Sequence, residues 1–166
     1  MTKLARWKSM SGNERRLWLT AWLTLPMLAL LLRCFGLRRT QKLLLSIHRR
    51  GAEFRRGFAE VFQTSSALPL RSLRLCGEQR FAEVVARLIN SAARYSPVTV
   101  NCLPQSLALW WMLRREGIEA ELRIGVRKAG QTMEAHAWVE LFGQALNDQT
   151  DVEQRFQPID ATNMPP

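Results

Sequence analysis

The sequence has few residues of the kinds that cross-link small folds or bind metals. Its 166 residues include three cysteines, two histidines and one tyrosine. Cys34, Cys76 and Cys102 are too few and too widely spaced for a disulfide framework, and no CxxC or HxxxH spacing indicates a zinc site. We therefore expect no metal, no cofactor and a cytoplasmic protein with reduced thiols.

Acidic residues are scarce in the first hundred positions. Residues 1–100 hold 18 Lys and Arg against 5 Asp and Glu, a net charge of +13, whereas residues 101–166 hold 6 against 9, a net charge of −3. A strongly basic segment attracts acidic peptides, phosphates or anionic surfaces. The overall composition, 47% hydrophobic and 23% charged, excludes a disordered or collagen-like chain.

An uncharged apolar run near the N-terminus is short for a membrane span. Residues 17–32 contain Pro26 and lie between Arg16 and Arg33, whereas crossing the hydrocarbon takes about 20 apolar residues. We interpret the run as a buried or surface-lying helix. Contact of residues 17–32 with a membrane surface, and a true span, stay open as alternatives.

The pattern along the chain predicts two parts. Residues 38–56 are basic with clustered leucines and predict a second helix that stops near Gly51. Residues 64–77 carry the Ser, Pro and Gly of a connector. Residues 78–95 repeat apolar side chains at three- and four-residue steps, which is typical of an amphipathic helix. We expect a basic helical region at 1–76, used for docking or substrate gripping, and a compact core at 77–166.

The core begins with a helix and continues with two strands. A suitable N-cap precedes residues 102–116 and Gly117 follows them, so Cys102 is expected at a helix N-terminus. Alternating apolar and polar residues predict strands at 120–127 and 134–141. The order favours an α+β fold in which this helix packs on a small antiparallel sheet.

Three residues of the core have the chemistry of a nucleophile, a base and an orienting acid. A helix N-terminus and a nearby imidazolium favour a thiolate at Cys102, and free amides there could stabilise an oxyanion. If residues 141–143 form a three-residue loop, His136 faces Asp148 directly. A carboxylate beside an imidazole fixes its tautomer. We therefore predict Cys102 as nucleophile, His136 as base and Asp148 as orienter.

Each of these residues alone has a simpler structural interpretation. A lone Cys in an amphipathic helix is usually a core residue, a lone His on a strand is usually structural, and an Asp near a hairpin is usually a turn former. However, all three occur within 47 residues, in helix, strand, strand order. His136 is also the one histidine after residue 100. The combination favours catalysis.

Three segments resemble a known family. The string CLPQSLALWWMLRREGIEAELRIGV at 102–126, AHAWVE at 135–140 and LND at 146–148 resemble the leader peptidases of lasso-peptide biosynthesis, whose core is transglutaminase-like and similar to papain. The resemblance is dense over residues 80–150. It implies a cysteine peptidase that removes the leader from a ribosomally made precursor, so that a separate lasso cyclase can close the macrolactam. The catalytic residues that it implies are the same three.

The resemblance also implies partners. Some members of the family carry a winged-helix-like element that binds the leader ahead of the peptidase, and residues 1–75 show no such strand-rich pattern. The chain therefore resembles the split type, in which a separate recognition protein binds the leader. The implied partners are the precursor leader peptide, this recognition protein and the lasso cyclase.

Two other classes of function stay open. A thiol-dependent acyl transferase of the transglutaminase-like class would use the same three residues, because both reactions begin with a thioester. A non-enzymatic basic binding module would use only the N-terminal charge. No nucleic-acid partner is expected, because no recognised binding motif appears and most of the tryptophans lie within apolar runs.

Overall fold

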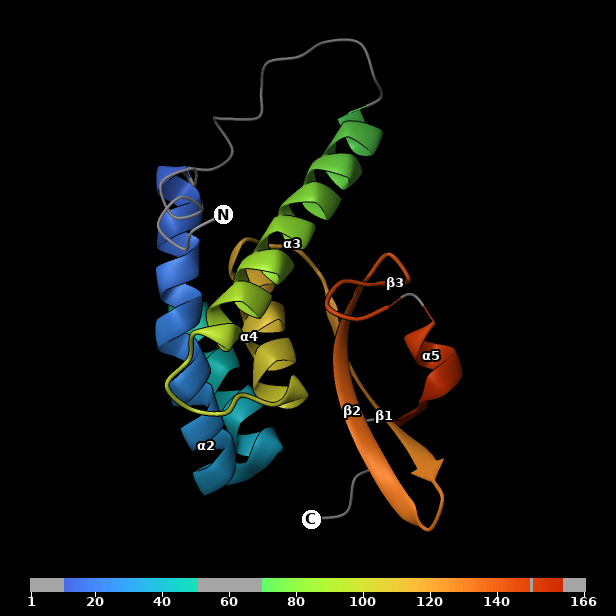
Figure 1. Ribbon diagram of the computed structural model, residues 1–166. Coiled ribbons are helices and arrows are strands. Elements are labelled where there is room, and N and C mark those ends of the chain that lie inside the picture. The colour runs from blue at the N-terminus through green and yellow to red at the C-terminus, as the bar shows by residue number, and fades with distance from the viewer. Residues whose placement is uncertain (1–10, 51–69, 150, 160–166) are drawn as a thin grey trace, which may run out of the picture.

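The computed structural model describes residues 11–50, 70–149 and 151–159. Its helices are α2 (Gly12–Arg50), α3 (Leu70–Arg94), α4 (Cys102–Arg115) and α5 (Val152–Arg155), and its strands are β1 (Glu121–Ala129), β2 (Thr132–Leu141), β3 (Gln144–Ala145) and β4 (Gln157–Ile159). The strands form one antiparallel sheet in the order β3-β2-β1-β4. Figure 1 shows α2, α3 and α4 on one side of the sheet and α5 on the other. The predicted α+β fold is confirmed.

Helix α2 consists of two legs that meet at Gly36. The backbone of this glycine is not helical (φ 71°, ψ 174°), a conformation open to glycine because it has no Cβ. Figure 1 shows the second leg turning back at this kink. The helix predicted at 17–32 and the one predicted from Arg38 to near Gly51 correspond to the two legs, and residues 51–56 of the basic stretch lie outside the described residues.

Helix α3 begins earlier than the sequence predicted. The connector expected at 64–77 is wrong from Leu70 onward, where α3 starts, because this stretch extends the amphipathic helix by two turns. Residues 64–69 lie outside the described residues. The boundary predicted between 76 and 77 stays a prediction, and α3 runs across it.

One hydrophobic core joins the three long helices and the sheet. Its fully buried side chains include Leu25, Leu28 and Leu44 from α2, Val85 and Ile89 from α3, Leu107, Leu109 and Leu113 from α4, and Val139 and Leu141 around β2. These side chains lie on the side of β2 that faces α4. The basic helical part and the sheet therefore contribute side chains to the same hydrophobic core.

Helix α4 begins and ends where the sequence predicted. Its N-cap is Asn101, and Gly117 (φ 79°) follows its last turn. The amides of residues 117 and 118 donate to carbonyls of that turn at 3.0 Å each, which is the Schellman arrangement. Both ends are thus defined by local chemistry, and Cys102 is the first residue of the helix.

The hairpin between β2 and β3 differs from the predicted three-residue loop. Leu141 pairs with Gln144, so the loop is Phe142 and Gly143, both with positive φ (52° and 74°). Two such residues match the right-handed twist of the flanking strands, whereas the prediction placed only the glycine in this conformation. The register is therefore shifted by one residue, and the pairing predicted across this hairpin is wrong.

The second face of the sheet is covered by the segment after β3. Trp138, Val152 and Phe156 form a buried cluster there. They pack over Gly125 of β1, where an added Cβ would lie 2.9 Å from the Cβ of Phe156 and 2.9 Å from the indole of Trp138. A glycine inside a strand often marks such a close approach.

Gly125→Ala is expected to lower the free energy of unfolding by about 1–3 kcal/mol, the usual cost of overpacking a core. The Cβ of Phe156 is attached to backbone and cannot swing away from the new methyl group. Urea denaturation followed by tryptophan fluorescence measures the effect. The control is Gly12→Ala, whose Cβ would have no neighbour within 4 Å, and equal stability of the two variants would contradict the packing argument.

Candidate active site

Cys102 lies at the N-terminus of α4 and is partly buried. The side chain of Asn101 makes no capping hydrogen bond, and Pro104 has no amide hydrogen. The amides of Cys102 and Leu103 are therefore the donors of the first turn. Together with the helix dipole they could stabilise an oxyanion that forms beside this residue.

His136 and Asp148 contact each other, as predicted, although the hairpin register differs. Nε2 of His136 is hydrogen-bonded to Oδ2 of Asp148. Because β3 ends at Ala145, Asp148 approaches the imidazole from a loop and not from a paired strand. The ring stacks on Phe156 (centroids 5.0 Å apart) and on Trp138 (6.3 Å). With Nε2 directed to the carboxylate, Nδ1 is the nitrogen left for a thiol proton.

Asp148 has three donors around its carboxylate. The amide of Gln149 lies 2.6 Å from Oδ1, Nη2 of Arg155 lies 2.8 Å from the same oxygen, and His136 binds the other. Burial alone would raise the pKa of Asp148, but these hydrogen bonds outweigh burial and the pKa is lowered. Its contribution to stability is therefore full above about pH 4 and is lost as the pH falls through the lowered pKa.

Hydrogen bonds join the three segments that carry these residues. The fully buried hydroxyl of Ser106 donates to the carbonyl of Ala137 at 2.8 Å. The side-chain amide of Asn147 donates to Ser106 Oγ and accepts from the amide of Val139, at 2.9 Å each. We call these contacts the Ser106–Asn147 network. It satisfies backbone groups of β2 that a longer β3 would otherwise pair.

The network has a member next to each predicted catalytic residue. Ser106 follows Cys102 by four residues, about 6 Å along the axis, on the same side of α4. The network's members in β2 and in the loop after β3 are sequence neighbours of His136 and Asp148. Figure 1 shows the start of α4 beside the middle of β2. Among the described residues no hydrogen bond joins thiol and imidazole, and the network ties the two elements together.

The buried carboxylate of Glu140 holds Trp138, the side chain on which the imidazole of His136 stacks. Its oxygens accept hydrogen bonds from Nε1 of Trp138 at 2.5 Å and from Nε of Arg123 at 3.0 Å. Burial raises the pKa of Glu140, but the hydrogen bond from Trp138 and the others around the carboxylate lower it overall. One oxygen of Glu140 thus holds Trp138, on which His136 stacks, and the other binds Arg123.

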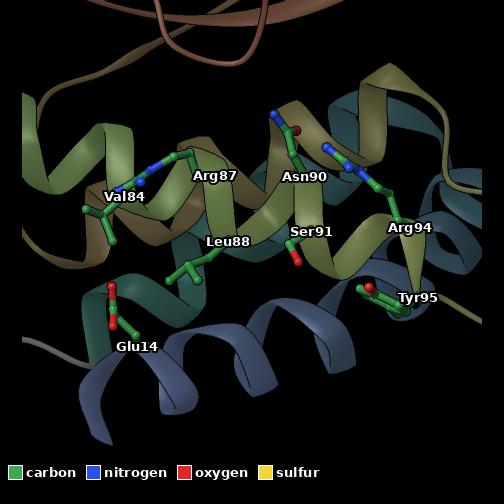
Figure 2. Close-up of a pocket in the computed structure, with 8 residues that line it drawn as sticks. All are labelled: Glu14, Val84, Arg87, Leu88, Asn90, Ser91, Arg94 and Tyr95. Carbon is green, nitrogen blue, oxygen red and sulfur yellow. The ribbon is translucent and has the colours of Figure 1, made fainter. Parts of the chain in front are cut away.

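The groove that the described residues form lies away from the predicted catalytic residues. A groove of about 470 Å³ lies along α3 and the start of α2, and Figure 2 shows it lined by Arg87 and Arg94 among others, with Glu14 opposite. None of the three predicted catalytic residues lines it. Over the described part of the chain, no group of three His, Cys, Asp or Glu side chains could hold a metal ion.

The residues that support the site have little signal in the sequence. Ser106 was concealed in an apolar helical run, and Asn147 and Arg155 showed no pattern that pointed to Asp148. Gly125 gave the clearest signal, because a glycine inside a strand often marks a close backbone approach. The Ile-Gly-Val string was read only as part of the family resemblance.

The residues and fold agree with comparisons to known proteins. The transglutaminase-like superfamily matches residues 43–161, and the chain belongs to this superfamily. It is similar to the microcin J25-processing protein McjB of Escherichia coli, with 39% identity over 59 residues, which are 36% of this chain and 27% of that protein. The chain thus spans about a quarter of the length of this curated relative. No solved structure matches the chain at a significant level.

Ser106→Ala is expected to lower the free energy of unfolding by about 1–3 kcal/mol, because it leaves the Ala137 carbonyl and the Asn147 amide without a buried partner. A double-mutant cycle with Asn147→Ala, measured by urea denaturation, should show a coupling of about 0.5 kcal/mol or more. Ser46→Ala is the control, since that hydroxyl is exposed and bonds only within its own helix. Additive effects of the two substitutions would contradict the network.

Proposed function

We propose that this chain is a cytoplasmic cysteine peptidase that removes the leader from a ribosomally made lasso precursor. The observation that carries the proposal is the contact between His136 and Asp148 next to the helix start that bears Cys102. Membership of the transglutaminase-like superfamily and similarity to a microcin-processing protein support it. Since 27% of that relative is covered, the similarity favours lasso-precursor processing in general, and the site supplies the proposed chemistry.

The first half of the reaction forms a thioester. Nδ1 of His136 accepts the thiol proton of Cys102 while Nε2–H donates to Asp148. The thiolate attacks the carbonyl carbon of the scissile bond, and the amides of Cys102 and Leu103 stabilise the resulting oxyanion. The imidazolium then protonates the departing nitrogen as the C–N bond breaks. The core peptide leaves with a free N-terminal amine, which the lasso cyclase can use.

The second half releases the leader. His136 takes a proton from water, the hydroxide attacks the thioester, and Cys102 leaves as the thiolate and regains its proton. If an amine attacked instead of water, the chain would be an acyl transferase of the same class. The product mass distinguishes the two, because hydrolysis adds one water and transfer adds the amine.

The basic helical part is the surface that we assign to docking of the leader or of its separate recognition protein. Arg38 and Arg39 are exposed on the second leg of α2. Beyond residue 76, Arg87 and Arg94 of α3 line the groove of Figure 2 and extend the basic surface. Cationic side chains of this density attract an acidic peptide and increase its rate of capture. This assignment requires neither a cofactor nor a nucleic acid.

Cys102→Ala is expected to fold normally and to leave the precursor uncleaved in the presence of its recognition protein, as read by mass spectrometry. A thiol alkylator should label Cys102 faster than Cys34 or Cys76, because only Cys102 lies at a helix N-terminus where a thiolate is favoured. Cys34→Ala is the matched control. Cleavage by Cys102→Ala within tenfold of the parent rate would exclude Cys102 as nucleophile, whereas no cleavage by the parent protein itself would favour the non-enzymatic module.

Asp148→Asn is expected to reduce kcat by about tenfold or more with little change in KM, because the amide no longer holds the productive imidazole tautomer. Asp151→Asn should be near neutral: that carboxylate lies 3.3 Å from Arg155 and makes no described contact with His136. Both variants are assayed by initial rates of leader cleavage. The opposite ranking would assign the orienting role to Asp151.

A further inference from the structure

The exposed side chains on the first leg of α2 form a single stripe. Between residues 16 and 33 they are Arg16, Leu19, Leu23, Met27, Leu30 and Arg33. Steps of three and four residues place them on one side of the helix. Leu23 and Leu30 are each 62% exposed. This α2 stripe is therefore a bare apolar surface with an arginine at each end.

The opposite side of the same leg is bound to the rest of the protein. Leu25 and Leu28 are fully buried in the main core. Nε1 of Trp22 donates to the carbonyl of Tyr95 at 3.0 Å, which fastens the leg to the end of α3. The first leg can therefore bind a surface through its α2 stripe. Lipid could surround the whole leg only if its buried side chains left the hydrophobic core.

The packing of the first leg against the core indicates whether this helix lies on a membrane or crosses it. By length and composition Gly12–Ser46 is the one helix among the described residues that could cross a bilayer, with a mean hydropathy of 1.6 over an 18-residue window of which 17% is buried. A spanning helix needs lipid or membrane-embedded protein on all sides. Since one side of this leg packs against α3 and α4, the geometry fits a helix that lies in the interface plane.

We propose that the α2 stripe docks this protein on an anionic lipid surface. The four apolar side chains would enter the boundary between headgroups and acyl chains, and Arg16 and Arg33 would contact lipid phosphates. The net charge of +13 over residues 1–100 adds long-range attraction to such a surface. This proposal stands independently of the peptidase function and assigns the basic N-terminal part a second role.

A second copy of the chain is a poorer occupant of the α2 stripe. In an antiparallel pairing of two stripes, Arg16 of one copy would meet Arg33 of the other, and in a parallel pairing each arginine would meet its own equivalent. Like charges would face each other in both arrangements, which opposes association. Anionic lipid complements both ends of the stripe at once.

Sedimentation of the full-length protein with vesicles tests the proposal. Binding is expected to vesicles of phosphatidylcholine and phosphatidylglycerol, and to weaken by about tenfold or more when phosphatidylglycerol is omitted or salt is raised to 0.5 M. Leu23→Glu with Leu30→Glu should reduce binding by at least about tenfold. The matched control is Met133→Glu, because Met133 is 66% exposed at the β1–β2 hairpin.

The remaining measurements decide against the proposal if they go the other way. Circular dichroism of each variant must match the parent, and Arg16→Gln with Arg33→Gln provides a conservative second pair that should also lose binding to anionic vesicles. Equal binding to both vesicle types, undiminished binding by the glutamate pair, or resistance to extraction at alkaline pH would overturn surface docking. Loss of a stable dimer in the glutamate pair would show that a second copy covers the stripe.

Discussion

The arrangement of the site depends on the shortness of β3. This strand pairs with only the end of β2, and the backbone of β2 beyond it still needs partners because buried carbonyls and amides are costly to leave unpaired. Ser106 and Asn147 provide them. Satisfying the edge of β2 with a side chain from α4 draws the start of that helix to the strand that carries His136.

This edge of β2 is also where side chains from the two faces of the sheet can come close to each other. Val139 and Leu141 pack on the α4 side, whereas His136 and Trp138 lie on the face covered by Phe156. A thiol on α4 and an imidazole on the other face could not meet across the middle of the sheet. Among the described residues β3 pairs only with the last two residues of β2, so we expect the thiol and the imidazole to approach each other at the unpaired edge beside His136.

Local sequence patterns predicted most of the helices and strands, but long-range packing determined the strand register and the contacts between them. The N-cap and Gly117 defined α4 because helix ends depend on adjacent residues. The β2–β3 register was missed because Phe142 adopts positive φ, which the sequence does not encode as glycine would. The contact of His136 with Asp148 was predicted correctly from an incorrect register, since a loop gives Asp148 a freedom that strand pairing denies. Ser106 and Asn147 had no local signal.

The surroundings of Asp148 constrain what it can do in the proposed reaction. Arg155 and the amide of Gln149 share one carboxylate oxygen while His136 binds the other. The same partners that lower the pKa of Asp148 oppose its protonation when the imidazole becomes charged. Asp148 would therefore act as a fixed anion that orients His136 and stabilises the imidazolium, and not as the final acceptor of the thiol proton. The site would transfer that proton between sulfur, His136 and the leaving amine alone.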